Sequence, residues 1–132
     1  MEAKEIAEIF IKAFKNKGKI LIFGNGGSAS QASHAATEFV GIGLPAIALN
    51  DSSVLTALSN DIGYDEVFSR QIQALGNKGD VVVGISSSGK SENVNRALAW
   101  ARQLELQVID FPRIGKTTAE VQENQLRLIH EV

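Results

Sequence analysis

Two hydrophobic patterns alternate along the chain, one with the period of a helix and one with the form of a buried strand. Helical spacing or composition marks five longer segments: residues 6–14, 29–40, 65–75, 94–104 and 118–132. Four short, continuous apolar runs lie between them: residues 19–23, 46–49, 81–85 and 106–111. Runs of this length are typical of strands that are covered on both faces. We therefore expect five long helices and four buried strands.

The ends of these helices are marked by residues with known capping preferences. Gly18 is expected to terminate the first helix and Gly76 the helix that begins at Asp65, because glycine commonly ends helices. Asp51 or Ser52 is expected to cap a short helix after the second strand. The chain therefore repeats the order of strand, loop and helix.

This repeated order predicts βαβ units, a parallel sheet and helices on both faces of the sheet. No linker divides the 132 residues, so we expect residues 1–132 to form a single domain. The predicted fold class is α/β, a three-layer αβα sandwich of flavodoxin-like or Rossmann-like type. In such sheets ligands bind at the carboxyl ends of the strands, so the loops at those ends are the expected place of a site.

Composition excludes several classes of function. Hydrophobic residues make up 44% of the chain and charged residues 21%, which is typical of a packed globular core. The formal net charge is −2 and no basic cluster stands out, so neither a nucleic acid nor a membrane is an expected partner. Cysteine is absent, which excludes disulfides and thiolate metal ligands. Because no apolar run could span a bilayer and no signal-peptide pattern opens the chain, we expect a cytoplasmic protein.

Two loops rich in glycine and serine follow predicted strands and open predicted helices: residues 24–28 and 86–91. Glycine allows close backbone approach, and a helix N-terminus offers N–H groups and a favourable dipole to an anion. The alternative is that Ser28 and Ser91 only cap their helices. Two such loops in one small sheet, one of them with three consecutive serines, favour a site for a phosphate group.

Both loops also match nucleotide-binding patterns. Gly24, Gly26 and Ala29 satisfy the dinucleotide pattern, but no acidic residue follows at the expected distance. Gly84 and residues 89–91 satisfy the phosphate-loop pattern of nucleotide hydrolases. The chain is small for such an enzyme and this interpretation leaves the first loop unused. Nucleotide binding is therefore kept as an alternative.

Polar side chains after the first loop offer acid–base or metal chemistry. His34 and Glu38 are four residues apart and share a helix face, where they can hold a metal or place an acid beside a base. The alternative is a solvent-facing polar stripe that includes Gln31. In the last helix Gln122 and His130 are eight residues apart, a rise of about 12 Å, which is too far to reach one atom easily from a straight helix.

Seven segments follow one another in an order that a known family shares. They are residues 24–28 (Gly-Asn-Gly-Gly-Ser), 59–61 (Ser-Asn-Asp), 67–71 (Val-Phe-Ser-Arg-Gln), 79–80 (Gly-Asp), 84–91 (Gly-Ile-Ser-Ser-Ser-Gly-Lys-Ser), 122–123 (Gln-Glu) and 129–130 (Ile-His). Together they resemble the SIS (sugar isomerase) domain family in its phosphoheptose isomerase branch, over nearly the whole chain. The resemblance implies a homotetramer with sites at subunit interfaces. It also implies conversion of sedoheptulose 7-phosphate to D-glycero-D-manno-heptose 7-phosphate for the heptose of lipopolysaccharide.

The resemblance implies roles for individual residues. Glu38 and His130 would form the catalytic acid–base pair. A zinc ion is held, in members that bind one, at the positions of His34, Glu38, Gln122 and His130. The positions implied to bind the substrate or its phosphate are Asn25, Gly26, Gly27, Ser28, Asp61, Ser86, Ser87, Ser88, Ser91 and Gln122. From its neighbours alone, Asp61 is typical of a turn.

Three positions depart from the family pattern. Lys90 stands where the family commonly has Asn, Gln125 replaces a usual His, and Ile42 stands where an Arg is usual. A non-catalytic branch, associated with replication initiation, lacks the Glu and His of the acid–base pair, so a sugar-phosphate-binding regulator is the alternative to an enzyme. The chain is also short for the family, and we expect a neighbouring subunit to complete its site.

Overall fold

A four-stranded parallel sheet forms the centre of the fold, with the strand order β2-β1-β3-β4. The computed structural model describes residues 1–132. The strands are β1 (Ile20–Gly24), β2 (Ala46–Ala48), β3 (Val81–Ile85) and β4 (Gln107–Asp110). Strands β1 and β3 pair along their whole length, and Gly24 lies opposite Ile85 at their carboxyl ends. The two loops that follow them therefore begin side by side.

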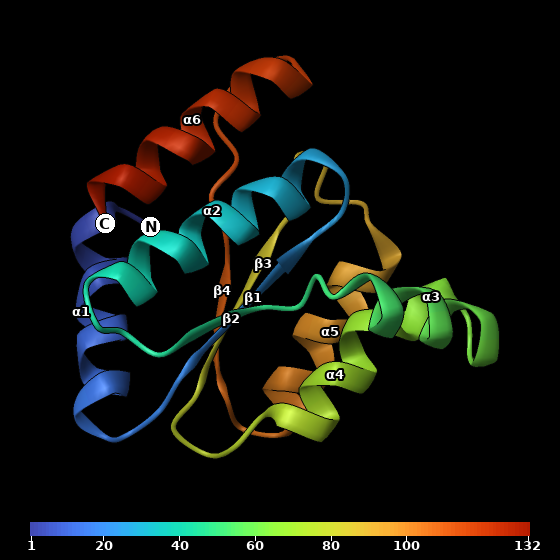
Figure 1. The fold of residues 1–132 in the computed structure, drawn as a ribbon. Coiled ribbons are helices and arrows are strands. Elements are labelled where there is room, and N and C mark those ends of the chain that lie inside the picture. Colours follow the sequence, from blue (N-terminus) through green and yellow to red (C-terminus); the bar gives the residue numbers. More distant parts are fainter.

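Helices cover both faces of this sheet (Figure 1). They are α1 (Ala3–Lys15), α2 (Gly27–Gly41), α3 (Ser52–Asp61), α4 (Val67–Leu75), α5 (Glu92–Gln103) and α6 (Thr118–Glu131), with a 3-10 turn, η1 (Tyr64–Glu66), before α4. Helices α1, α2 and α6 pack on one face, and α4 and α5 on the other. The expected three-layer αβα sandwich is confirmed. None of the helices combines the length and the apolar composition that crossing a membrane requires.

Side chains of the central strands enter two separate cores because successive residues of a strand point to opposite faces. Ile22 enters the core that contains Phe10 and Phe39, whose ring centroids are 5.1 Å apart. Phe23 points the other way and packs on Phe68, with ring centroids 4.9 Å apart. Both faces of β1 are thus fully packed, which makes the strand a rigid support for the loop that follows it.

The expectation of four buried strands is correct for β1 and β3 and wrong for the outer two. All five residues of each central strand are buried. In β2, Ile47 is 42% exposed, and in β4 both Gln107 and Asp110 are exposed. The reason is the strand order, because β2 and β4 each have a neighbour on one side only. An apolar run alone does not distinguish an edge strand from a central one.

The predicted helix ends hold with two differences. Asp51 caps α3, its side chain accepting from the Val54 N–H, and α4 ends before Gly76 as expected. The first helix, however, ends at Lys15, and the left-handed residue after it is Lys17, with φ 62°. Gly18 is required for another reason, since the chain there passes directly against the backbone of Gly79. At the start of the fourth helix, the 3-10 turn η1 occupies the residues predicted as helical from Asp65.

Candidate functional site

The first loop joins β1 to α2 at the carboxyl edge of the sheet (Figure 1). Gly26 has φ 55°, a conformation that residues with a side chain rarely adopt. Gly24 allows the loop to lie against β3, because a Cβ there would be 2.6 Å from the Ile85 carbonyl oxygen. Ser28 is buried inside α2 and does not occupy the capping position. The glycines of this loop therefore permit a close approach to the second loop.

The second loop, which we call the serine loop (residues 86–91), gathers hydroxyl groups that face one another. The Ser86 Oγ lies 3.3 Å from the Ser91 Oγ and 3.5 Å from the Ser88 Oγ. The Gly89 N–H donates to Ser86 Oγ and the Lys90 N–H donates to Ser88 Oγ, each at 3.0 Å. Ser91 stands at the N-cap of α5 but makes no capping hydrogen bond with its side chain. The capping alternative therefore fails for Ser28, whereas Ser91 occupies the N-cap without a capping bond from its side chain. The hydroxyls of Ser86, Ser88 and Ser91 form a cluster that can donate to an anion.

A cation that sequence analysis did not select lies against the serine loop. The Arg113 guanidinium packs on Gly89, where a Cβ would be 3.0 Å from the Arg113 Cζ. Asp110 holds this guanidinium with two hydrogen bonds of 2.8 and 3.2 Å. These bonds raise the pKa of Arg113 above its ordinary value, so its positive charge is secure. The only sequence signal was an arginine shortly after the predicted fourth strand, and that signal is weak.

Helix α6 lies alongside α2 and contacts both loops (Figure 1). The Gln125 side chain, only 1% exposed, donates to the Ser86 carbonyl oxygen at 3.2 Å. Gln31 donates to the Gln122 carbonyl oxygen at 2.7 Å, and the Gln122 amide lies so close to Gly27 that a Cβ there would be 2.6 Å from its Nε2. Gln31 is therefore buried between two helices, and the solvent-facing stripe that included it is wrong for this residue.

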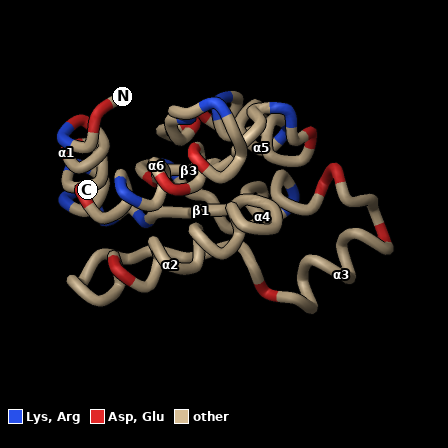
Figure 2. The backbone as a smooth tube through the Cα atoms, turned by 90° about the horizontal axis from the view of Figure 1, so that it is seen from above, with Lys and Arg blue, Asp and Glu red and all other residues tan.

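Helices α2 and α6 also bring His34, Glu38 and His130 together. The His34 Nε2 lies 2.8 Å from the His130 Nε2 and 3.4 Å from the Glu38 Oε1. One ligand atom of each residue lies within 4.8 Å of the other two. Glu38 is the only Asp, Glu, Lys or Arg of α2, so its charge stands alone on that helix (Figure 2). Two imidazoles and a carboxylate form a donor set that fits a divalent metal such as zinc, and one that can transfer protons.

Two other predicted residues do not join this group within the chain. Gln122 contacts Gly27 instead. On α6, Gln122 lies eight residues before His130, which is a rise of about 12 Å. Asp61 ends α3, where it is exposed and accepts a hydrogen bond from Asn60 at 3.1 Å. Helix α3 buries none of its residues. The fold thus assembles three of the four predicted metal ligands and leaves Asp61 at the surface.

Asn25 in the first loop has two partners from elsewhere in the chain, which sequence analysis did not select. They are Asn93 on α5 and Tyr64 in η1. The turn that carries Tyr64 is anchored by Glu66, which accepts from the Ser69 hydroxyl at 3.0 Å and pairs with Arg96 of α5. The hydrogen bond from Ser69, followed by that from Arg96, lowers the pKa of Glu66 below its ordinary value of 4.5.

Replacing Ser69 by alanine is expected to raise the pKa of Glu66 toward 4.5, because it removes the larger stabilising contact of the carboxylate. The folded state favours the charged form, so the stabilisation is present above pH 4.5 and is lost as pH falls through the lower folded pKa. Carbon NMR of the Glu66 carboxyl against pH measures this shift. Arg102→Ala, on the same helix as Arg96, is the control and should leave the titration in place. An unaltered protein in which Glu66 titrates at its ordinary value would contradict the assignment.

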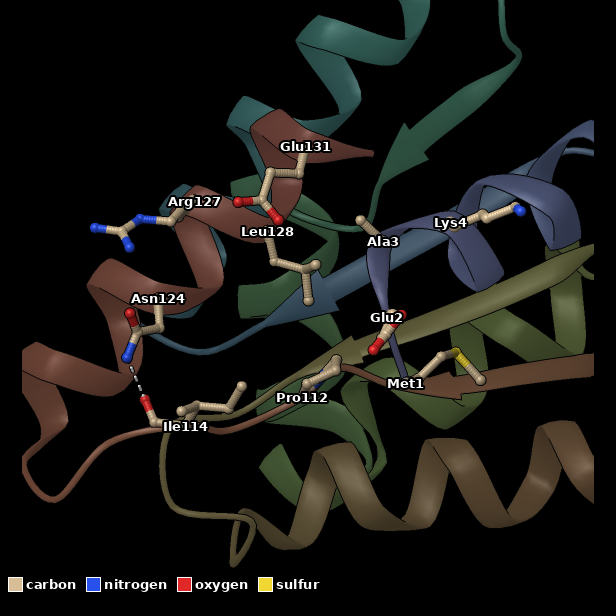
Figure 3. A pocket seen from close by; sticks show the side chains of 10 residues that line it. All are labelled: Met1, Glu2, Ala3, Lys4, Pro112, Ile114, Asn124, Arg127, Leu128 and Glu131. Carbon is tan, nitrogen blue, oxygen red and sulfur yellow. Dashed lines mark hydrogen bonds between the residues drawn. The ribbon is translucent and has the colours of Figure 1, made fainter.

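A pocket of about 500 Å³ lies between the start of α1, helix α6 and the segment after β4 (Figure 3). Arg127 and Lys4 point away from it in opposite directions, and the Asn124 side chain bonds the Ile114 carbonyl oxygen at 2.7 Å. None of its lining residues belongs to the two loops or to the His34, Glu38 and His130 group. Because it lacks convergent catalytic groups, this pocket is not the candidate site.

The parallel sheet, with a glycine loop and a serine loop side by side at its carboxyl edge, has the arrangement in which α/β proteins commonly bind phosphorylated ligands. The chain belongs to the SIS domain family, whose sequence pattern matches residues 2–111.

Three proteins similar to this chain are phosphoheptose isomerases. The chain is 55% identical to a phosphoheptose isomerase from Thermodesulfovibrio yellowstonii over 82% of its own length and 57% of that protein. It is 44% identical to the phosphoheptose isomerase of Trichlorobacter lovleyi over 96% of its own length and 76% of that protein. The solved phosphoheptose isomerase of Neisseria gonorrhoeae superimposes with a TM-score of 0.93 at 42% identity, over 97% of this chain and 80% of the other. The chain spans 57% of the length of the T. yellowstonii protein and 60% of the length of a phosphoheptose isomerase from Helicobacter pylori.

Proposed function

We propose that this chain is a ketose–aldose isomerase that converts sedoheptulose 7-phosphate to D-glycero-D-manno-heptose 7-phosphate. The observation that carries the proposal is the close group of Glu38, His34 and His130 between α2 and α6. The phosphoheptose isomerases to which the chain is similar support the choice of substrate. Such an enzyme would act in the cytoplasm on the path to lipopolysaccharide heptose.

The proposed reaction passes through a cis-enediol or enediolate. Glu38 removes the proton from the carbon beside the substrate carbonyl while His130 protonates the carbonyl oxygen, which gives the enediol. Glu38 then returns the proton to the former carbonyl carbon as the neighbouring hydroxyl gives its proton back to His130, which gives the aldose. Each of these roles is worth about 10²–10⁴-fold in rate. The substrate phosphate would bind at the serine loop through Ser86, Ser87, Ser88 and Ser91, and at the first loop through Gly26, Gly27 and Ser28. Asn25 and Asp61 would contact the sugar.

A metal site fits the same residues. We propose that His34, Glu38 and His130 hold a zinc ion. Gln122, the fourth ligand that the resemblance implies, lies about 12 Å from His130 along α6 and does not reach the same ion within one chain. When bound, zinc would polarise the substrate carbonyl or orient the sugar hydroxyls. A carboxylate that ligates tightly is not a free base, so the metal would be positional, or absent, while Glu38 transfers the proton. The donor set on α2 and α6 supports this proposal because it contains only the nitrogen and oxygen ligands that zinc accepts.

We also propose a homotetramer in which a neighbouring subunit completes each site. Large apolar side chains around α2 and β2 are exposed in the single chain: Val40, Ile42 and Ile47. Helix α3 buries no residue, and both α2 and α3 carry few charged residues (Figure 2). Surfaces of this kind are typical of contacts between subunits.

The experiment that tests the function is incubation with sedoheptulose 7-phosphate in D₂O, followed by NMR. We expect deuterium at the carbon beside the carbonyl together with an aldose 7-phosphate, because the enediol exchanges its proton with solvent. A sample without protein controls for spontaneous exchange. Failure to exchange with or without added zinc would overturn the proposal and favour the non-catalytic sugar-phosphate-binding protein.

A further inference from the structure

The side chain of Asn25 is held in one orientation by two residues from other elements. Its Nδ2 donates to the Asn93 Oδ1 at 2.8 Å, and the Asn93 Nδ2 donates back to the Asn25 Oδ1 at 3.1 Å. The Tyr64 hydroxyl donates to the same Asn25 Oδ1 at 2.6 Å. Asn93 is 2% exposed, whereas Tyr64 is 54% exposed. Three segments that are distant in sequence therefore meet at one amide group.

The hydrogen-bonding capacity of Asn25 leaves one group free. A primary amide has two N–H donors and a carbonyl oxygen with two lone pairs. Asn93 and Tyr64 take both lone pairs, and Asn93 takes one N–H. Turning the Asn25 amide over by itself would set its N–H group against the N–H group of Asn93, which is unfavourable, whereas the Tyr64 hydroxyl can donate or accept. In the arrangement of the structure, Asn25 offers a ligand a single N–H donor.

This amide pair also joins the two loops of the site. Asn25 follows Gly24, which lies opposite Ile85 at the start of the serine loop. Asn93 is in the first turn of α5, two residues after Ser91. The pair thus connects the first loop to the helix that follows the serine loop. Amides that satisfy each other in this way fix the geometry of the groups they join.

We propose that Asn93 and Tyr64 are positioning residues that keep Asn25 as a hydrogen-bond donor to an acceptor oxygen of the bound sugar phosphate. The inference rests on the proposed function and deepens it, because it states which polarity the first loop presents to the sugar. A site built around a fixed donor discriminates strongly against a ligand without the matching acceptor. Tyr64 and Asn93 act through Asn25, so their effect should disappear when Asn25 is removed.

A double-mutant cycle tests this dependence. The variants are Tyr64→Phe, Asn93→Leu and Asn25→Ala, alone and combined, in the full chain. Turnover kinetics and calorimetry with sedoheptulose 7-phosphate give kcat, KM and Kd, and side-chain amide NMR follows Asn25 directly. Thr56→Val is the matched control, since it removes a hydroxyl that bonds only backbone carbonyls of the neighbouring helix α3.

Tyr64→Phe should raise KM and Kd about 3- to 10-fold, the size expected for one lost hydrogen bond, and leave kcat within about 2-fold. It should also shift the Asn25 amide signals, and it should change Kd less than about 2-fold when Asn25 is already alanine. Asn93→Leu should act in the same direction with a larger effect. Because Asn93 is buried, any loss of folding in that variant leaves Tyr64→Phe as the deciding one.

Two outcomes would overturn the inference. In the first, Tyr64→Phe has the same effect with and without the Asn25 side chain; in the second, it leaves both Kd and the Asn25 amide signals unchanged. Binding without turnover in the unaltered chain would overturn the proposed reaction alone, because the cycle can still be measured on Kd. Absence of binding would overturn both.

Discussion

Replacing Glu38 by glutamine is expected to lower kcat for isomerisation by about 10²–10⁴-fold, the size of a general-base contribution. Glutamine keeps the shape of the side chain and removes the charge that accepts the proton. Binding of sedoheptulose 7-phosphate should survive, because the two loops that would hold the phosphate are unchanged. Stopped-time NMR assays measure kcat, and calorimetry on the same variant measures Kd.

Two further variants separate proton transfer from metal binding. Glu8→Gln makes the same chemical change at an exposed position of α1, away from the site, and should retain full activity. His34→Asn removes a proposed zinc ligand and leaves the proposed base in place, so it should reduce zinc affinity more than it reduces kcat. A Glu38→Gln variant with full activity would remove Glu38 from the mechanism. Equal losses of kcat in the Glu38 and His34 variants would instead assign Glu38 to the metal alone.

Gly24→Ala is expected to lower the free energy of unfolding by about 1–3 kcal/mol and to weaken binding of the sugar phosphate. The new Cβ would lie 2.6 Å from the Ile85 carbonyl oxygen and 2.7 Å from the Ser28 Cβ. Neither is the far end of a flexible side chain, so the first loop has to move away from β3. The groups of the two loops that are proposed to bind the substrate phosphate would then no longer converge. Urea unfolding and calorimetry measure the two effects.

Gly41→Ala is the matched control for this substitution. Gly41 is the last residue of α2, and a Cβ there would meet no atom within 4 Å. Alanine is the better helix former, so this variant should be neutral or more stable by up to about 1 kcal/mol. A Gly24→Ala protein that unfolds at the same urea concentration as the unaltered chain, with the same Kd, would show that the close approach is not required.

The central strands and the two loops were predictable because their signals are local. The apolar runs of β1 and β3 are continuous, and each is followed at once by glycine or serine and then by a helix. The exposure of β2 was not predictable, since its apolar residues match those of a central strand. Burial of Gln31 was not predicted either, because the residue that covers it is distant in sequence. Its environment depends on α6, which comes 91 residues later at Gln122.

Some residues of the candidate site were also predictable from local spacing, and others were not. His34 and Glu38 were paired by their helical spacing, and the structure confirms that they face each other. The proximity of His130 followed only from the family resemblance, because no spacing rule connects residues 96 positions apart. Asn93, Tyr64 and Arg113 were not selected at all. Each is an ordinary surface or helix residue in the sequence and gains its role from what packs beside it.

Local patterns in the chain were enough to predict the element types, the parallel α/β class, the two glycine- and serine-rich loops and the His34–Glu38 pair. These follow from periodicity, capping and glycine placement, which act over a few residues. Tertiary packing brings His130 to His34, 96 residues away in sequence. It also brings Asn93 and Tyr64 to Asn25, across 68 and 39 residues. Such contacts depend on the order of the strands and on which face of the sheet each helix covers. Those are properties of the packed chain as a whole, and no local pattern encodes them.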